Sequence, residues 1–129
     1  METLLLIGRI LFGGYFFMMG MMHFKNLKML TGYASSKNVP SPSFAVVISG
    51  IILFLGGLGI ILGVYIKVSL LLIAIFLFFI TPKMHAFWKE TDSGIKMTEM
   101  TNFLKNMALL GATLALYALS AGWPLSLIL

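Results

Sequence analysis

The stretch from Pro42 to Ile80 decides the fold, and it has the sequence PSFAVVISGIILFLGGLGIILGVYIKVSLLLIAIFLFFI. Its one charged residue is Lys67, so a short polar break separates two apolar segments. At about 1.5 Å per residue, roughly 20 residues cross the ~30 Å hydrocarbon core of a bilayer. The break at residues 64–67 has room only for a tight turn between antiparallel helices. The stretch therefore predicts a transmembrane hairpin, with spans at about 43–63 and 66–88.

The composition of the whole chain also places it in lipid. Of its 129 residues, 60% are hydrophobic and 10% are charged, whereas a soluble domain carries about 25% charged residues. The net charge of +5 comes mainly from lysines in loops between apolar segments, a pattern typical of contact with anionic lipid and not of a nucleic-acid-binding protein. The chain has no cysteine, which excludes disulfides, thiol chemistry and thiolate metal sites.

Two further apolar segments predict spans at about 3–22 and 102–121. Between the first two spans, an apolar side formed by Phe24, Leu27, Leu30 and Ala34 predicts a short helix lying in the membrane interface. The charged segment 89–101 predicts a solvated loop. We therefore expect an all-α fold in a single domain covering residues 1–129, namely a membrane four-helix bundle with a short interfacial helix between spans one and two.

The distribution of lysines predicts the orientation in the membrane. The loops after spans one and three, with the adjoining span ends, hold most of the basic residues, namely Lys25, Lys28, Lys37, Lys83, Lys89, Lys96 and Lys105. The opposite side has Arg9 and Lys67. The positive-inside rule then predicts cytoplasmic loops at 23–42 and 89–101 and two non-cytoplasmic termini. We expect the protein to be integral to a prokaryotic cytoplasmic (inner) membrane.

Polar residues gather where span three ends, at Thr81-Pro82-Lys83-Met84-His85-Ala86-Phe87-Trp88, and where span four begins. A neutral imidazole can exchange a proton with a bound head group, an indole can stack on a ring, and an asparagine amide can orient a carbonyl oxygen. The candidate ligand site is therefore His85, Trp88, Asn102 and Asn106, with His23 at its rim. The alternative interpretation is an interfacial aromatic belt with asparagines that hold helices together.

Arg9 is the one charge inside the first predicted span, and an intramembrane ionisable group is a functional hypothesis by default. We expect it to face the bundle and to hydrogen-bond near Tyr117 on span four or to backbone carbonyls. The alternative is that it snorkels to the outer surface. No metal site is expected, because two histidines without cysteines or acids in the spans make a poor ligand set.

Several short motifs, taken in order and spacing over nearly the whole chain, make it resemble the DoxX family of small four-span membrane proteins. They are Gly8-Arg9 and Gly20, Asn38-Val39-Pro40, Ser49-Gly50, Gly56-Gly57, Leu62-Gly63, His85-Ala86-Phe87-Trp88 and Lys105-Asn106-Met107-Ala108-Leu109-Leu110-Gly111. In one respect the chain departs from the family. Many relatives carry a glutamate shortly after the Ser-Gly pair, where Ile51-Ile52-Leu53-Phe54 is apolar here. A role that needs this glutamate in relatives, such as pairing with Arg9 or moving protons, is therefore not carried over to this chain.

The resemblance implies a link to quinones and redox stress, since some members are the membrane subunit of a thiosulfate:quinone oxidoreductase. Others are associated with resistance to quinones and catechols, or with membrane complexes that detoxify oxidants. The first hypothesis is a redox-associated membrane subunit that binds a quinone or another small apolar molecule, with no covalently bound cofactor. The second is a non-catalytic assembly subunit of a larger membrane complex, and the third is a small-solute carrier. We expect the protein to associate either with other membrane protein subunits or, as a homo-oligomer, with further copies of itself. The first hypothesis predicts a polar-lined cavity near His85 that opens to lipid. The second predicts a packed bundle without a cavity and with a large apolar surface for partners.

Overall fold

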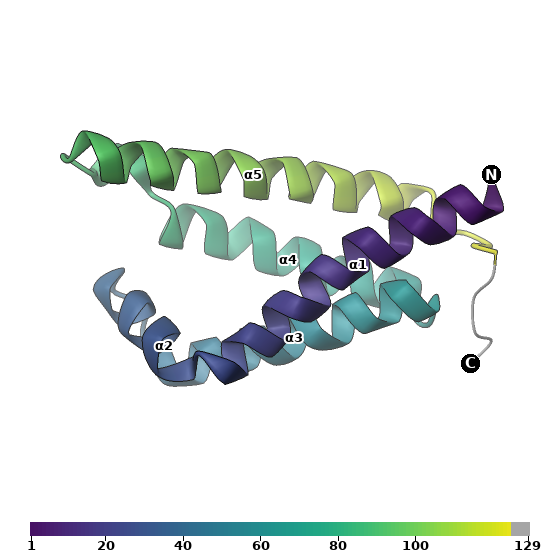
Figure 1. Cartoon of the computed structure of the whole chain (residues 1–129), viewed down its shortest axis with the longest axis horizontal. Coiled ribbons are helices and arrows are strands. Elements are labelled where there is room, and N and C mark those ends of the chain that lie inside the picture. The colour runs from purple at the N-terminus through teal and green to yellow at the C-terminus, as the bar shows by residue number, and fades with distance from the viewer. Residues whose placement is uncertain (125–129) are drawn as a thin grey trace.

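The structure, a computed structural model, describes residues 1–124, and every regular element in that range is a helix (Figure 1). In chain order these are α1 (Glu2–Lys25), α2 (Leu27–Ser36), α3 (Pro42–Leu62), α4 (Ile66–Met84), the 3-10 turn η1 (Phe87–Lys89) and α5 (Ser93–Ala118). The all-α class is therefore confirmed, and a short helix does connect the first two long ones.

Three helical segments are long and apolar enough to cross a membrane, namely Glu2–Lys25, Pro42–Leu62 and Ile66–Lys89. They identify a membrane-spanning protein, and they match the first three predicted spans closely. The helix α5 is 26 residues long but falls outside this group, because Asn102, Lys105 and Asn106 lower the mean hydropathy of its otherwise apolar part from residue 101 onward.

Close contact between α1 and α3 forms the centre of the fold. A side chain added at Gly13 would meet the backbone oxygen of Gly57 at 2.7 Å, and one added at Gly20 would meet the backbone nitrogen of Phe54 at 2.5 Å. Lipid gives no hydrophobic driving force for helix association, so helices in a membrane rely on close packing. Glycines at such positions let the two backbones approach closely. Phe16 of α1 and Leu53 of α3 are both buried beside this contact.

A tight turn joins α3 to α4, as the sequence predicts. Gly63 has a φ of 72°, the left-handed conformation that ends many helices, and its backbone N–H bonds to the carbonyl of Gly59. The helices α3 and α4 pack together, and α4 packs in turn against α5. Their shared core contains Ile60, Leu70, Ile73, Leu77 and Leu110.

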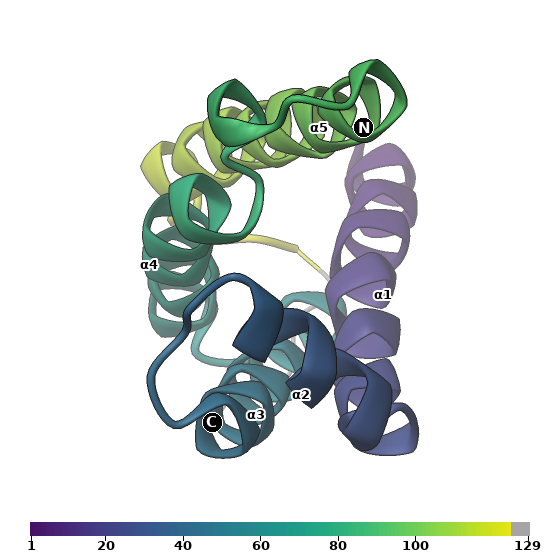
Figure 2. The same cartoon turned by 90° about the vertical axis from the view of Figure 1, so that its left-hand side faces the viewer.

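The helices α1 and α5, by contrast, form no packed interface along their lengths. At the end of the bundle that faces the viewer in Figure 2, α5 begins on one side and α1 ends on the other. The helix α2 lies across this end, packed on α3 and α1. The bundle is therefore closed on the α3–α4 side and loosely closed on the α1–α5 side.

The structure corrects one predicted boundary near this end and shows an interruption within the third span. Most of the expected loop 89–101 is helical, because Asp92 caps the start of α5 by accepting hydrogen bonds from the N–H groups of Gly94 at 2.8 Å and Ile95 at 3.0 Å. The third span is also not one continuous α-helix to residue 88. The helix ends at Met84, two residues after Pro82, whose ring removes a helix hydrogen bond.

Candidate functional site

A cavity of about 520 Å³ lies inside the bundle at the end covered by α2, and we call it the inner cavity. All five α-helices contribute to its wall, together with residues just beyond α2 and α4. Its apolar wall includes Phe16, Met19, Leu53, Phe76, Leu77 and Ile80. Its polar wall includes His23, Tyr33, Ser49, His85, Glu99, Asn102, Lys105 and Asn106. Four of the five residues predicted for a ligand site therefore line one cavity.

The polar wall on α5 presents two side-chain amides. Asn102 and Asn106 are four residues apart and so lie on the same face of the helix. Asn106 is only 8% exposed, and its amide makes no hydrogen bond within residues 1–124. The buried polar atoms without a partner in the described chain belong to Thr31, Thr81 and His85, so the Asn106 amide is not sealed off but reaches the cavity. It therefore offers a donor and an acceptor to a bound molecule.

His85 stands where α4 ends, with its ring on the cavity wall. Its Nδ1 lies 3.5 Å from Oε2 of Glu99, close enough for electrostatic attraction. The geometry is not that of a hydrogen bond, and Nδ1 is buried with no hydrogen-bond partner in the described part of the chain. The imidazole is therefore held beside a carboxylate without being locked in one tautomer.

Glu99 joins α5 to α2 across the end of the cavity, and it is 5% exposed. The hydroxyl of Tyr33 donates to both carboxylate oxygens, at 3.0 and 3.1 Å. The ammonium of Lys37 lies 3.0 Å from Oε2 of Glu99 and 3.1 Å from Oε1 of Glu90. We call Tyr33, Lys37, Glu90 and Glu99 the α2 latch.

The latch shifts the pKa values of its members. Burial favours a raised pKa for Glu99, but hydrogen bonds from Lys37 and Tyr33 and the nearby positive charges outweigh it and lower that pKa. Burial acts against the charged form of Lys37 too, yet its bonds to the two glutamates raise its pKa. Burial and the neighbouring Glu99 raise the pKa of Tyr33 to about 12. Glu99 and Lys37 are therefore ionised, and Tyr33 is neutral, near pH 7.

Replacing Glu99 by glutamine is expected to release α2. The lowered pKa means that ionised Glu99 stabilises the latch at pH values above the pKa of an unfolded glutamate, and that this stabilisation is lost as the pH falls through its lower folded pKa. E99Q should lower the free energy of opening α2 by about 2 kcal/mol and remove the acid-side pH dependence. Hydrogen exchange of the α2 amides in detergent, across a pH series, measures both.

Glu90 offers the matched control for this experiment. Its side chain is 27% exposed and touches only Lys37 within the latch, so E90Q should change α2 protection much less. Equal α2 protection in wild type and E99Q at neutral pH would show that the latch does not hold α2.

His23 lies on the part of the cavity wall where α1 meets α3, whereas Glu99 of the latch lies on α5. Its Nδ1 is 3.0 Å from the carbonyl oxygen of Val46 and 3.1 Å from the hydroxyl of Ser49. A carbonyl oxygen only accepts, so Nδ1 carries the proton and donates to it. In the neutral ring Nε2 is then left as an acceptor for a ligand.

Trp88 lies outside the cavity wall, contrary to the stacking role expected for it. It is 51% exposed and packs edge-on against Phe87 and Phe103. The α-helix ends at Met84, and Trp88 stands in the 3-10 turn after His85, outside the cavity wall.

Arg9 is 2% exposed and does face the bundle, at the far end from the cavity. It donates to the carbonyls of Ile60 and Ile61, each at 3.1 Å, and to that of Pro124 at 2.6 Å. Its guanidinium also lies 5.7 Å from the ring centre of Trp123. Arg9 was expected to hydrogen-bond either near Tyr117 or to backbone carbonyls, and the described bonds are to backbone carbonyls. Tyr117 is 40% exposed and takes no part in them.

Glu99, which the sequence places in a solvated loop, lies instead on the cavity wall. Tyr33, Lys37 and Glu99 are functional candidates that were missed. The one signal that could have found them is Asp92 followed by Ser93-Gly94, a helix start that places Glu99 two turns into a helix and one turn before Asn102. No cluster of three or more metal-ligating side chains occurs within the described residues.

Comparison with known proteins gives one match. The family model DoxX matches residues 4–86, more than half of the chain, from the first turn of α1 to just after α4. Searches of the curated proteins and of the solved structures found no match. The matched range includes Arg9, the glycine contact of α1 with α3, His23 and His85. This chain belongs to the DoxX family.

Proposed function

We propose that this membrane protein binds a quinone-like molecule in the inner cavity, as the membrane subunit of a redox system. The observation that carries the proposal is Asn106, an almost fully buried residue on the cavity wall whose amide makes no hydrogen bond within the described structure. A quinone carbonyl oxygen accepts a hydrogen bond from such an amide. Asn102, His23 and His85 stand within the same wall to meet the second oxygen.

The size and lining of the cavity support this class of ligand. A volume of about 520 Å³ lies within the ~300–1,000 Å³ typical of small-molecule sites, which are mostly apolar with a few placed polar groups. Phe16, Leu53 and Phe76 offer apolar surface to a flat ring. A packed bundle without a cavity, the arrangement expected of a purely structural subunit, is not what these helices form.

The chemistry of the wall favours binding over self-contained catalysis. His85 beside Glu99 can accept or release a proton, but an electron acceptor is not supplied by the side chains of the cavity. Electrons would therefore pass to or from a partner subunit, with the quinone as the exchangeable carrier.

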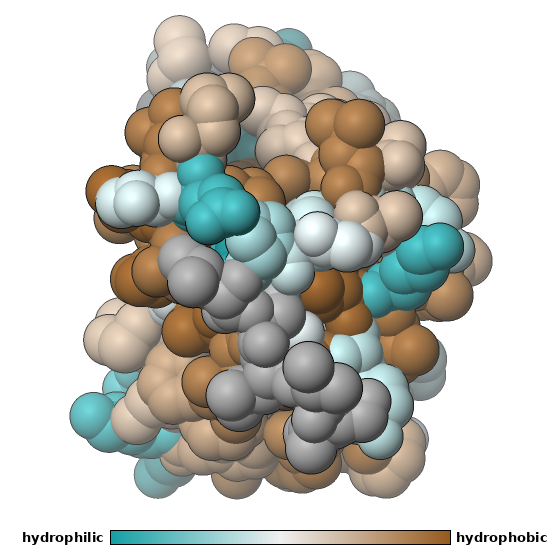
Figure 3. All heavy atoms as spheres, turned by 90° about the vertical axis from the view of Figure 1, so that its right-hand side faces the viewer, coloured by the Kyte–Doolittle hydropathy of each residue, from teal (hydrophilic) through white to brown (hydrophobic). Residues whose placement is uncertain are grey.

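The same proposal includes the arrangement in the membrane. We infer that α5 is a fourth crossing, because it packs along α4 for much of its length and ends near the start of α1 (Figure 1). The end with α2 and η1 holds most of the lysines and would be cytoplasmic. The opposite end shows mainly apolar surface with separated polar residues (Figure 3). Impermeant labelling of a cysteine placed at Ser36, in a chain that has none, tests this orientation.

Quinone binding to the purified protein tests the function. Wild type is expected to bind a benzoquinone, and N106L should weaken binding by about tenfold, because a hydrogen bond between the amide and the quinone contributes about 1.4 kcal/mol. H85A should weaken it as well. Leu71 is 49% exposed and distant from the cavity, so L71A serves as the control and should bind like wild type.

The opposite results would separate the alternatives. If wild type bound no quinone in a folded, monodisperse preparation, the quinone assignment would fail and the assembly-subunit hypothesis would be favoured. If wild type bound quinone and all three variants bound it equally, the ligand would lie outside the inner cavity.

A further inference from the structure

The inner cavity is closed on the side of the aqueous loops. The helix α2 covers it there, with Leu30, Tyr33 and Ala34 on the wall. The latch fixes α2 to α5 through Glu99, whose two oxygens are fully engaged by Tyr33 and Lys37. A molecule dissolved in water would have to break this buried ion pair to enter.

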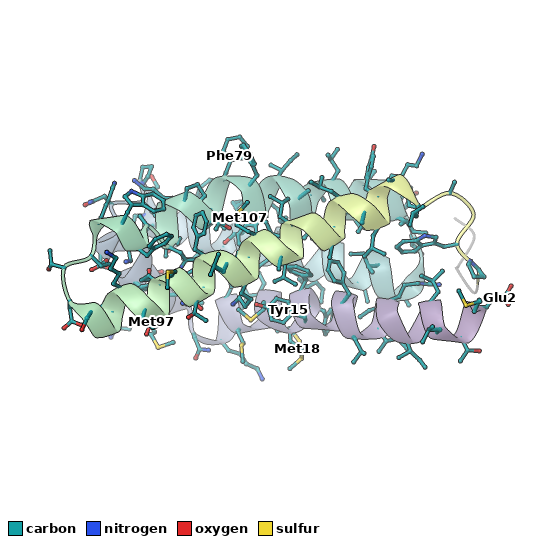
Figure 4. All side chains as sticks on the ribbon, turned by 90° about the horizontal axis from the view of Figure 1, so that it is seen from above. Glu2, Tyr15, Met18, Phe79, Met97 and Met107 are labelled. Atoms are coloured by element: carbon teal, nitrogen blue, oxygen red, sulfur yellow. The ribbon has the colours of Figure 1, made fainter. Side chains whose placement is uncertain are left out.

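The residues on the cavity wall that are exposed point to a different opening. Of all the lining residues, only Thr98 and Lys105 are exposed, and both lie on the same edge of α5. The ammonium of Lys105 lies 5.9 Å from the ring centre of Tyr15 on α1. This contact spans the side where α1 and α5 form no packed interface, and Figure 4 shows Tyr15 between these two helices.

The two helices that border this opening expose apolar side chains as well as Thr98 and Lys105. Met18 and Met22 on α1 are 54% and 44% exposed, and Leu104 on α5 is 58% exposed. Figure 4 shows Met18 directed away from the bundle beside Tyr15. Side chains of this kind face lipid in a membrane-spanning protein, so the opening leads into the hydrocarbon core and not into water.

We propose that the gap between α1 and α5 is a lateral portal, through which the cavity takes an amphiphile with a polar head and a long hydrocarbon tail. This inference rests on the proposed function, and it narrows the ligand to a membrane-dissolved, tailed quinone. The head would occupy the polar wall at Asn102 and Asn106, while the tail would leave between Tyr15 and Lys105 and remain in lipid. The Tyr15–Lys105 contact would close the portal behind it.

Cross-linking across the portal tests this route. Met18 and Thr101 are exposed and lie outside the cavity wall. On their antiparallel helices they lie about one turn from Tyr15 and Lys105, both toward the end that α2 covers. M18C and T101C, joined by a short bis-maleimide in the otherwise cysteine-free chain, would tie α1 to α5. The control pair is S36C and K89C, two positions that flank one small cleft between the end of α2 and η1, so its cross-link keeps α2 closed.

The measurement is the rate at which a radiolabelled decyl-tailed benzoquinone, delivered in lipid vesicles, is retained by the protein in nanodiscs, after subtraction of the uptake by empty nanodiscs. The portal cross-link is expected to slow uptake by about tenfold or more, because entry would then need the tied helices α1 and α5 to separate and a required conformational change lowers the association rate. The control cross-link should leave the rate unchanged. A tail-less benzoquinone added in water should bind more slowly than the tailed one.

Each other result is decisive. If the control cross-link slows uptake and the portal cross-link does not, the ligand enters past α2 and the portal is refuted. If wild type binds the quinones and neither cross-link changes the rate, the portal is refuted while the proposed function stands. If the uncross-linked protein binds neither quinone, the proposed function itself fails.

Discussion

Replacing Arg9 by leucine is expected to lower the free energy of unfolding by about 3 kcal/mol or more, the largest stability effect of any single charge in the chain. The guanidinium donates to three backbone carbonyls, two near the end of α3 and one at Pro124. A hydrogen bond from a charged donor contributes about 1.5–3 kcal/mol. Leucine would leave these carbonyls beside an apolar side chain, in a region without water to replace the donor. Thermal unfolding in detergent measures the loss.

Two further variants make this result interpretable. R9K keeps the charge but offers a compact ammonium in place of the planar fork, so it should retain only part of the stability. Lys67 is exposed at the same end of the bundle, so K67L removes a charge without a buried role and should unfold like wild type. An unchanged unfolding temperature for R9L would mean that the carbonyls of Ile60 and Ile61 do not depend on Arg9.

The hairpin of α3 and α4 was predictable because lipid leaves few choices. Two apolar segments of sufficient length around Lys67 can only cross, turn and cross back, and the structure places the turn at residues 63–65. Arg9 was predictable for the same reason, since a buried guanidinium needs acceptors. His23, His85, Asn102 and Asn106 were brought together by the antiparallel order of the helices alone.

Glu99 was not predictable in the same way, because its environment depends on a contact between distant parts of the chain. A glutamate among Lys96, Thr98 and Asn102 has the local pattern of a solvated segment. It is buried only because α2 folds back over the cavity and brings Tyr33 and Lys37 to it. For Trp88 the difference is the reverse, because a residue predicted for the site lies outside the cavity wall. The helix α4 ends at Met84, soon after Pro82, and Trp88 stands in the 3-10 turn that follows.

Replacing Gly13 by alanine is expected to destabilise the protein by about 2 kcal/mol, within the range for overpacking a close contact. The new Cβ would lie 2.7 Å from the carbonyl oxygen of Gly57 and 2.9 Å from Cγ1 of Ile61. The oxygen belongs to the backbone of α3 and cannot turn aside as a side chain could, so α1 and α3 would have to separate. Because α3 also carries His23's partners Val46 and Ser49, quinone binding should weaken together with stability.

Gly14 provides an unusually close control, since it is the next residue on the same helix and a Cβ there would meet nothing within 4 Å. G14A gains the helix propensity of alanine, worth up to about 1 kcal/mol, and should be neutral or stabilising. The two variants have the same composition and the same change of side chain, so propensity, detergent binding and expression affect both alike. Only the distance to α3 differs. If G13A and G14A unfold at the same temperature, the helices do not depend on the close glycine approach, and the position of α1 beside the cavity must be held by Arg9 and the side chains around Phe16.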